Sequence, residues 1–299
     1  MDHLIWSKPL VAAALLALLW TLESAAPIDP GRHRRLQHGL TNLGMGLINA
    51  LAVSMPAAGL LYGVTEWARV ANFGLTRWIG VPAWMAWVAV LMAFDVWMYW
   101  WHRFNHRISW LWRFHAVHHS DWELDATSAV RFHPGEIIFS TLARLVVLPV
   151  LGMTLPQLLV YETLLLPVVL FHHSNVRVPR VMDAGLRWLI VTPRMHWVHH
   201  SQERWEADSN YSVVLSIWDR LFGTYQFRPN PESLRLGLHD EDGGLRSRTF
   251  KEVLSAPFLS PIRRCNLGEA ARGVQDAVMS RASKGDRADC ASRAGYSEG

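Results

Sequence analysis

Hydrophobic residues of this chain gather into long runs that charged residues hardly interrupt. An apolar run at 9–22 follows Lys8, and residues 43–64 carry no charge at all. Residues 78–101 form a third run, in which Asp95 is the single acid. The second and third runs are long enough to cross a bilayer, which needs about 20 residues in a helix. The pattern therefore predicts membrane-spanning helices at 43–64 and 78–101.

A fourth run, at 137–171, is too long and too broken for one straight span. It is interrupted by Arg144, Gly152, Pro156 and Pro167. Glycine and proline disfavour a continuous helix, so these breaks predict two apolar helices that turn between the glycine and the first proline.

The chain after the last apolar run is mostly polar. Residues 211–228 are predicted to form a short amphipathic helix that ends near Gly223. After about residue 262 small and charged residues dominate, which predicts a poorly ordered tail. The expected fold is all-α, a polytopic membrane helical bundle with a cytoplasmic helical cap. Its expected parts are an N-terminal apolar helix and basic loop, a membrane-embedded catalytic domain, a cytoplasmic extension and a disordered tail, at residues 1–36, 37–228, 229–264 and 265–299.

Composition supports a membrane protein and argues against two other classes. Hydrophobic residues make up 51% of the chain and charged residues 18%, whereas soluble proteins have about 25% charged residues. The net charge is only +4, and arginines scattered among tryptophans do not form the solvated basic face that nucleic-acid binding requires. The two cysteines, Cys265 and Cys290, form neither a zinc motif nor a disulfide framework. We therefore expect no nucleic-acid partner, and any metal site must use histidine.

The arginines set the expected orientation, because basic loops stay on the cytoplasmic side of a membrane. Arginines within 32–35 precede the first span and arginines within 103–113 follow the second, so a spanning hairpin places both on one side. The 137–171 hairpin then leaves and returns to that side. The histidine-rich segments would face the cytoplasm, in a bacterial inner membrane or an equivalent. The 9–22 run has a rival interpretation as a cleaved signal peptide, since SAAP follows at 24–27.

Eight histidines fall into three sets with helical spacing. The sets are His102 and His106; His115, His118 and His119; and His196, His199 and His200. On a helix, residues three and four apart share a face, so the ring nitrogens of one set can converge. Eight imidazoles exceed what one ion needs, so we predict two metal ions with four or five ligands each. Burying so many imidazoles without a shared partner would leave nitrogens unpaired.

Three alternatives to a dimetal site account for the histidines less well. A lone histidine at a membrane interface is usually an amphipathic filler, but these eight are not isolated. Bis-histidine haem uses widely spaced single ligands, which HxxHH triplets do not offer. A zinc transporter would place carboxylates and histidines along the spans themselves.

Four further residues are candidates near the metals. Asp95 lies two helical turns before His102 and is predicted to hold a ligand imidazole in one tautomer; the alternative is an acid that is hydrogen-bonded inside the bundle. His172 and His173 close the last apolar run, and either one can complete a five-coordinate shell. His133, in RFHPGE, is expected to be structural or at the edge of the site. No role is assigned to the histidines that lack partners in the sequence, His3, His33, His38 and His239.

Together these motifs resemble the fatty acid hydroxylase superfamily, also called the sterol desaturase family. The family pattern is HxxxH, HxxHH and HxxHH in that order, and this chain reads HRFNH, HAVHH and HWVHH. Flanking text is similar too: DVWMYWWHR leads into the first box, and FHHSNV ends the last apolar hairpin. The resemblance covers about residues 40–228. The chain departs from the family pattern after Asn210, where NYS replaces the common NYG, and we expect Ser212 to alter the turn beneath the third box.

The resemblance implies an integral membrane, O2-dependent non-haem diiron oxygenase. Its reaction would hydroxylate or desaturate an unactivated C–H position of a lipid such as a sterol, fatty acyl or alkyl lipid. The residues that match the family's metal ligands are His102, His106, His115, His118, His119, His173, His196, His199 and His200. Of the pair in the HSN motif, the family pattern selects His173 before His172. Two iron ions are implied, and zinc can replace them in purified protein because divalent-metal affinity favours zinc over Fe(II).

The chain carries no flavin, Rossmann or CxxC signature that would supply electrons. We therefore expect a ferredoxin or cytochrome b5-type donor with its reductase, and a lipid that enters laterally from the bilayer. Sequence does not choose between hydroxylation and desaturation. The competing function class is a non-catalytic metal-binding or metal-transport membrane protein.

Overall fold

The computed structural model describes residues 2–32, 34–80, 82–238 and 249–259, and within them the secondary structure is helical. The helices are α1 (Asp2–Ala25), α2 (Arg35–Ile48), the π-helix η1 (Asn49–Ser54), α3 (Met55–Val70), α4 (Leu75–Ile79), α5 (Ala83–Arg107), α6 (Ser109–His119), the 3-10 helix η2 (Ala126–Val130), α7 (Pro134–Leu151), α8 (Leu155–His173), α9 (Arg180–Leu186), α10 (Pro193–His199), α11 (Arg204–Ala207), α12 (Ile217–Leu221), the 3-10 helix η3 (Pro231–Ser233) and α13 (Phe250–Leu259). Extended segments of the described residues pair only as isolated bridges, such as Ile190 with Leu215. The all-α prediction is confirmed.

Within the part of the chain that the structure describes, four stretches are long and apolar enough to cross a membrane, as expected of an integral membrane protein. They are Arg35–Ile79, Ala83–Arg107, Pro134–Leu151 and Leu155–His173. The first contains the span predicted at 43–64, the second includes residues 83–101 of the span predicted at 78–101, and the last two are the predicted hairpin. Gly152 ends α7 with φ 77°, a left-handed conformation that glycine adopts without steric cost, so the turn lies where the sequence places it.

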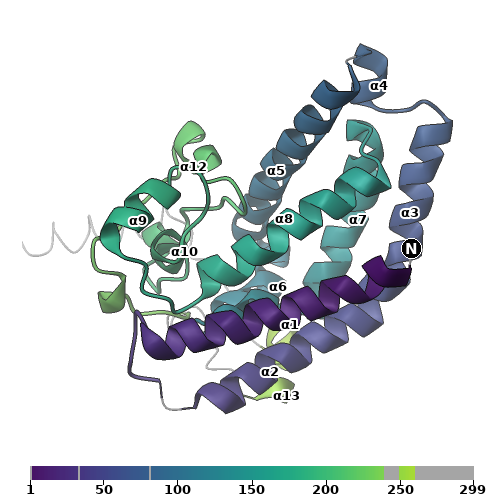
Figure 1. Ribbon diagram of the computed structural model, residues 1–299. Helices are drawn as coiled ribbons and strands as arrows, with labels where there is room; N and C mark the ends of the chain where they lie inside the picture. The colour runs from purple at the N-terminus through teal and green to yellow at the C-terminus, as the bar shows by residue number, and fades with distance from the viewer. Residues whose placement is uncertain (1, 33, 81, 239–248, 260–299) are drawn as a thin grey trace, which may run out of the picture. The chain divides into compact units, whose positions relative to one another are not determined.

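The four long helices α3, α5, α7 and α8 pack together as a bundle (Figure 1). Its core is apolar: Val90 and Phe94 of α5 meet Leu148 of α7 and Tyr161 of α8. Phe94 and Tyr161 pack edge to face, with ring centroids 4.9 Å apart. Because these residues recur at helical spacing on faces that point inward, their burial fixes how the bundle packs.

One buried acid, Glu23, attaches the N-terminal helix α1 to the rest of the fold. Glu23 of α1 accepts hydrogen bonds from the backbone N–H of Ala126 (2.8 Å) and of Asn175 (2.9 Å), and it pairs with Arg35 at 2.6 Å. Its side chain is almost fully buried. The bonds join α1 to the start of η2 and to the segment after α8.

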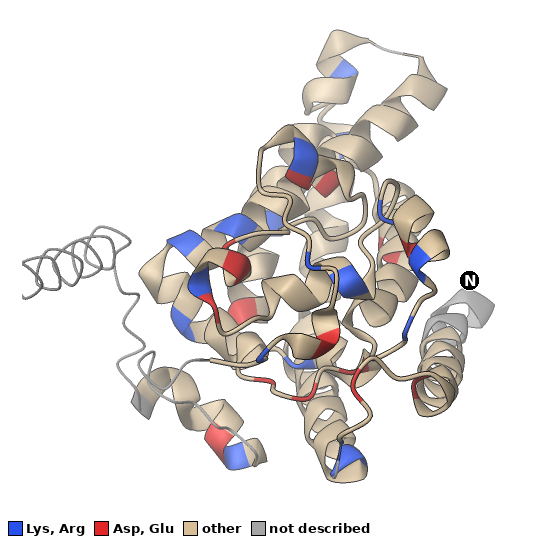
Figure 2. Ribbon diagram, turned by 90° about the vertical axis from the view of Figure 1, so that its left-hand side faces the viewer, with Lys and Arg blue, Asp and Glu red and all other residues tan. Residues whose placement is uncertain are grey.

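Short helices form a cap at one end of the bundle, which we define as α6, η2 and α9–α12. Figure 2 looks onto this side, where basic and acidic residues lie near one another on the short helices and loops. α13 also packs here: Val253 and Ala256 contact Met45 of α2 and Val117 of α6. The described helices α1 to α13 lie in one compact unit, and the part boundaries expected at 36 and 228 stay predictions. The expected tail at 265–299 lies outside the described residues.

The predicted amphipathic helix at 211–228 is wrong, because only α12 is helical there. The backbone of this segment has other partners. The N–H groups of Tyr211 and Ser212 donate to the carboxylate of Asp219, at 2.7 and 3.0 Å. The carbonyl of Tyr211 accepts from His102. A continuous helix would have to give up these bonds.

Candidate metal centre

Nine buried histidines converge in the cap end of the bundle and form two groups. Within each group, one ring nitrogen of every member lies within 4.8 Å of the others. The five-histidine group is His102, His106, His115, His119 and His199, and the four-histidine group is His118, His173, His196 and His200. These are the nine residues that the sequence predicts as ligands, and the division matches the expected four or five per ion.

The helices explain how the sets meet. His102 and His106 lie one turn apart at the end of α5, and the extended backbone of Ile108 (φ −98°, ψ 116°) then redirects the chain into α6. α6 and α10 each present histidines three and four residues apart, as their spacing predicts. The second and third boxes each contribute to both groups, so neither group is built from one helix alone.

Hydrogen bonds orient the imidazoles of the five-histidine group toward its centre. The Nδ1–H of His102 donates to the carbonyl of Tyr211 (2.9 Å), and that of His199 donates to the carbonyl of Ser209 (2.7 Å). The Nδ1–H of His115 donates to the carboxylate of Glu136 (2.8 Å). Each bond places the proton on Nδ1 and leaves the lone pair of Nε2 free, which is the arrangement found around histidine metal ligands.

The buried nitrogens at the centre of this group have no hydrogen-bond partner among the described residues. They include Nε2 of His115, His119 and His199. Buried polar atoms without partners are rare in native proteins. A cation between these lone pairs would satisfy all of them, so the residues fit a metal ion.

The four-histidine group brings its Nε2 atoms even closer. The Nε2 atom of His173 lies 3.1 Å from that of His118 and 3.0 Å from that of His196, and His196 is 3.1 Å from His200. Two ligands about 2.0–2.1 Å from one ion and at right angles would be about 3 Å apart. The Nδ1–H of His173 donates to the carbonyl of Val169, so its Nε2 presents a lone pair. This group also fits a metal ion.

Five of these imidazoles, those of His118, His119, His196, His199 and His200, are held neutral, which is the form that binds a metal. Burial, together with the neighbouring imidazoles, lowers the pKa values of His118, His119, His196 and His200 well below 6.5. Burial lowers the pKa of His199 to about 3.

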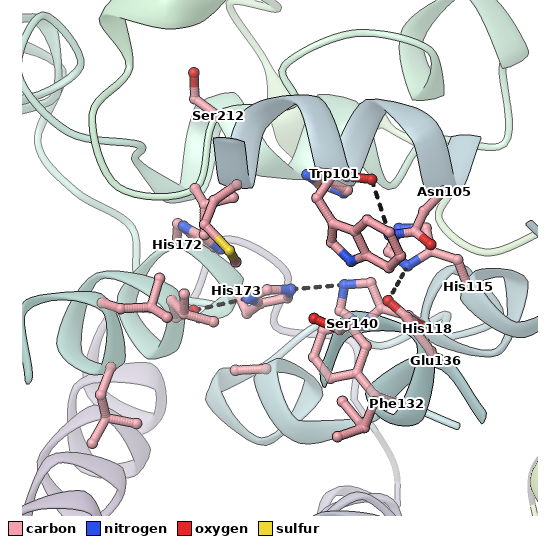
Figure 3. A pocket seen from close by; sticks show the side chains of 18 of the residues that line it. Trp101, Asn105, His115, His118, Phe132, Glu136, Ser140, His172, His173 and Ser212 are labelled. Atoms are coloured by element: carbon pink, nitrogen blue, oxygen red, sulfur yellow. Dashed lines mark hydrogen bonds and ion pairs between the residues drawn. The ribbon is translucent and has the colours of Figure 1, made fainter. Parts of the chain in front are cut away.

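A cavity of about 420 Å³ lies between α5, α7 and α8 and reaches both groups. His115, His118, His172 and His173 line one end of it, together with Trp101 and Phe132 (Figure 3). The walls beyond are mainly apolar, with Leu165, Leu166 and Val169 from α8. A cavity with mainly apolar walls beside two clusters of imidazoles suits a hydrocarbon chain.

Comparisons with known proteins agree with this geometry. The fatty acid hydroxylase family matches residues 87–224, which contain all three histidine boxes and the HSN motif. The chain is 28% identical over 275 residues to an ornithine lipid hydroxylase of Rhizobium tropici, covering 89% of this chain and 80% of that protein. The matched region, residues 87–224, belongs to the fatty acid hydroxylase family.

Two further relatives are similar over shorter parts. An alkylglycerol monooxygenase of Danio rerio is 31% identical over 236 residues, which are 77% of this chain and 48% of that protein. A cholesterol 25-hydroxylase of Mus musculus is 27% identical over 152 residues, or 48% of each chain. This chain therefore spans about half the length of these two relatives. No solved structure gives a significant match.

The position of Asp95 corrects the prediction that it supports a ligand imidazole. Its carboxylate accepts hydrogen bonds from the hydroxyl of Tyr161 (2.7 Å), the indole N–H of Trp218 (2.7 Å) and the backbone N–H of Leu215 (3.1 Å). Asp95 therefore joins α5 to α8 and to α12. The alternative interpretation, an acid that is hydrogen-bonded inside the bundle, holds.

The structure gives His133 a structural position, which is one of the two expected for it. It caps α7: its Nδ1 accepts from the N–H of Gly135 (2.9 Å), and its Nε2 lies 3.2 Å from the carbonyl of Leu254 in α13. His172 is closer to the histidine groups, since its ring packs on that of His196 with centroids 4.0 Å apart, but it belongs to neither group.

Asn210 is hydrogen-bonded to α10, the helix that carries the third histidine box. Its Nδ2 donates to the carbonyl of Met195 in α10 and to that of Gln226, each at 2.9 Å, and its Oδ1 accepts from the N–H of Gln226. It adopts a left-handed conformation with φ 50°, which asparagine tolerates better than most residues. Ser212 of the NYS sequence packs into the same turn, where its hydroxyl accepts from the N–H of Asp219 (3.2 Å).

Two supporting residues were not predicted as site residues. Glu136, which holds His115, follows that histidine by 21 residues, so no local spacing reveals the pair. His38, which was assigned no role, lies between Asp121 (2.7 Å) and Asp125 (3.1 Å), and so it does have partners. In the sequence, this contact could have been suspected from Asp121, the acid that lies two residues after the second histidine box. His33 and His239 lie outside the described residues, as does the side chain of His3.

Proposed function

We propose that this chain is a membrane-bound, O2-dependent hydroxylase that attacks an unactivated C–H position of a lipid and uses two iron ions. The observation that carries the proposal is the meeting of two imidazole groups at the end of an apolar cavity. The match to the family, whose relatives here are named as lipid hydroxylases or monooxygenases, supports a lipid hydroxylase over a metal transporter. It also favours hydroxylation over desaturation.

The two histidine groups would each hold one iron, and the pair would supply the oxidising chemistry needed to break a C–H bond with O2. The chain's own residues prepare the site. Glu136 and the carbonyls of Ser209 and Tyr211 hold imidazoles in the tautomer that binds metal. Burial lowers the pKa values of His118, His119, His196, His199 and His200 far enough that these imidazoles take up no protons that would displace a cation near pH 7.

The cavity positions the substrate. Its apolar walls exclude water from a bound hydrocarbon chain, and Trp101 and Phe132 flank the end nearest the histidines (Figure 3). A substrate held there needs only a small movement to bring one carbon beside the metals, which lowers the entropic cost of reaction. The lipid class in the proposal extends to acyl, alkyl-ether and sterol lipids.

The proposal includes an external electron donor and an orientation. A ferredoxin or cytochrome b5-type protein with its reductase would deliver two electrons for each O2. The cap would face the cytoplasm of a bacterial inner membrane or an equivalent, because the basic segments beside it are of the kind retained there.

The first experiment measures metal content per chain. Protein purified from iron-supplemented cells is analysed by element, alongside His118→Ala and His199→Ala. We expect about two ions per wild-type chain. Each variant should lose at least the ion of its own group, and with it O2-dependent formation of oxidised lipid in membranes supplied with reductant. Metal transport in vesicles without any oxidised lipid would establish the transport function instead. Intact wild-type protein without stoichiometric metal would overturn the proposal.

A further inference from the structure

An arginine and a glutamate face each other across the cavity, away from the histidines. Nη1 of Arg144 in α7 and Oε1 of Glu162 in α8 are 3.6 Å apart, and both side chains line the cavity. Arg144 follows Glu136 by eight residues, or about 12 Å along a helix, and Glu162 precedes His173 by eleven, or about 16 Å. The pair therefore lies well inside two membrane-spanning helices.

The position is costly for two charges. Ionisable side chains inside membrane spans are rare, and they mark substrate or ion pathways when they occur. The side chains of Arg144 and Glu162 are 18% and 34% exposed, so neither reaches bulk water from the middle of a span. Their mutual attraction offsets part of the desolvation cost. It does not explain why they stand at the cavity.

Arg144 lacks the oxygen acceptors that a guanidinium group requires. The group carries five N–H donors. Its distance to Glu162 is longer than a hydrogen bond, and its other polar contact is to the sulfur of Met98 at 3.8 Å. Its Nε is buried without a partner among the described residues. An acceptor supplied by a ligand would complete the site.

The chemistry of the pair selects the ligand group. An anion would be attracted by Arg144 but repelled by Glu162, and a cation would meet the reverse. A neutral group that both accepts and donates hydrogen bonds can bind to both residues at once. A hydroxyl or an amide group does this, whereas an ether or ester oxygen only accepts.

We propose that Arg144 and Glu162 form a polar anchor that binds a hydroxyl or amide group of the lipid. Glu162 accepts a hydrogen bond from this group of the lipid, and Arg144 donates a hydrogen bond to it. Held at this fixed distance from the histidines, the lipid presents one part of its chain to the metals. This inference rests on the proposed function, and it makes Arg144 and Glu162 positioning residues.

The test compares matched lipids that differ only in donor ability. Metal-loaded full-length protein in phosphatidylcholine nanodiscs is incubated with tritiated hexadecan-1-ol or its methyl ether, and with hexadecanamide or methyl hexadecanoate; empty nanodiscs give the background. We expect the alcohol, the amide or both to bind about tenfold more tightly than the matched ether or ester, since a buried donor or acceptor left unpaired has an effect of this order. Comparing the two arms shows whether hydroxyl or amide is the natural group.

Substitutions of Arg144 and Glu162 test whether these two residues cause the preference for the alcohol or the amide. Arg144→Leu combined with Glu162→Leu removes both charges together, so that no unpaired buried charge remains, and should bring the preference down to about one. Glu162→Gln keeps a carbonyl acceptor and should retain most of it. The matched control is Arg69→Leu with Glu66→Leu, an exposed ion pair on α3 that does not line the cavity, and it should bind like wild type.

Two results would overturn the anchor: equal binding of matched lipids by wild type, or an undiminished preference in the double variant. If the double variant does not fold, the wild type and Glu162→Gln still decide. Metal content is measured on the same samples. If wild type holds two metal ions but binds matched lipids equally, the proposed function stands and the anchor is ruled out. If wild type shows the lipid preference but holds no metal, the anchor stands and the proposed function is ruled out.

Discussion

His199 and His38 are both largely buried imidazoles, but their ring nitrogens face different partners. His199 donates from Nδ1 to a backbone carbonyl and points Nε2 at other imidazoles. His38 has a carboxylate on each nitrogen, Asp121 on Nε2 and Asp125 on Nδ1. The first arrangement suits a neutral metal ligand, and the second suits an imidazolium that joins two acids. The contrast teaches that burial alone does not make a histidine a ligand, because the neighbours decide its charge.

The network around His38 also braces the second histidine box. Asp121 lies two residues after His119, and it accepts from the hydroxyl of Ser128 as well as from His38. Burial opposes the charge of Asp121, but His38 and Arg131 outweigh it and lower the pKa of this carboxyl well below 3.8. α2, α6 and η2 are therefore held together by charges, whereas each of the two histidine groups brings together imidazoles that could hold a cation.

The largest effect that separates these regions is expected for Asp121→Asn. Removing one partner from a buried charge cluster typically costs about 3–5 kcal/mol, because the other charges stay buried. We expect a clear fall in the midpoint of thermal unfolding even in metal-free protein. The control is Glu66→Gln, which breaks an exposed pair with Arg69 and should leave the midpoint unchanged. An unaltered midpoint in Asp121→Asn would mean that the network is not a brace.

A smaller effect, confined to one ligand group, is expected for Glu136→Leu. Without its acceptor, His115 loses the bond that fixes its tautomer, and such losses weaken metal binding about 10–100-fold. Stepwise titration of metal-free protein should show one weakened ion, that of the five-histidine group, and one normal ion. Glu136→Gln keeps an acceptor and should lie between wild type and Glu136→Leu. Equal weakening of both ions would contradict the division into two groups.

The smallest expected effect is on the pH dependence of stability, where the histidine groups and the network around His38 should lose stability in different pH ranges. The pKa of His199 is lowered to about 3, so the unfolded chain binds protons below pH 6.5 that the folded chain refuses. Metal-free protein should therefore lose stability as the pH falls from about 6.5. Burial opposes the charge of Asp125, but its bond with His38 helps to lower the pKa of this carboxyl below 3.8. The stability that this carboxyl contributes is present above pH 3.8 and is lost as the pH falls below it.

Thermal midpoints of metal-free protein, measured in detergent across this range, check the sign of both losses. Asp125→Asn should lack the loss below pH 3.8 and keep the one that begins near 6.5. Metal-loaded protein should resist the first loss until its ions are released. A flat midpoint between pH 6.5 and 5 in metal-free protein would show that the imidazoles are not held neutral by the fold.

Much of the site could be predicted from short-range spacing. HRFNH, HAVHH and HWVHH place imidazoles three and four residues apart, and a helix of any context puts such residues on one face. The prediction failed where partners are distant. Asp95 shares a helix with His102, but Tyr161 and Trp218 from other elements supply its hydrogen bonds. The 211–228 segment failed for the same reason, since Asp219 takes the backbone N–H groups that a helix would use.

The sequence by itself determined that the chain is helical and spans a membrane and that it turns at Gly152, and it predicted nine histidines as metal ligands. These properties depend on hydrophobicity and on residues a few positions apart. Only the tertiary structure decided how the histidines divide into five and four, which acids face them, and that Arg144 meets Glu162 across the cavity. Such pairings depend on how whole helices pack, and the energy of packing is shared among many apolar contacts that no short motif records.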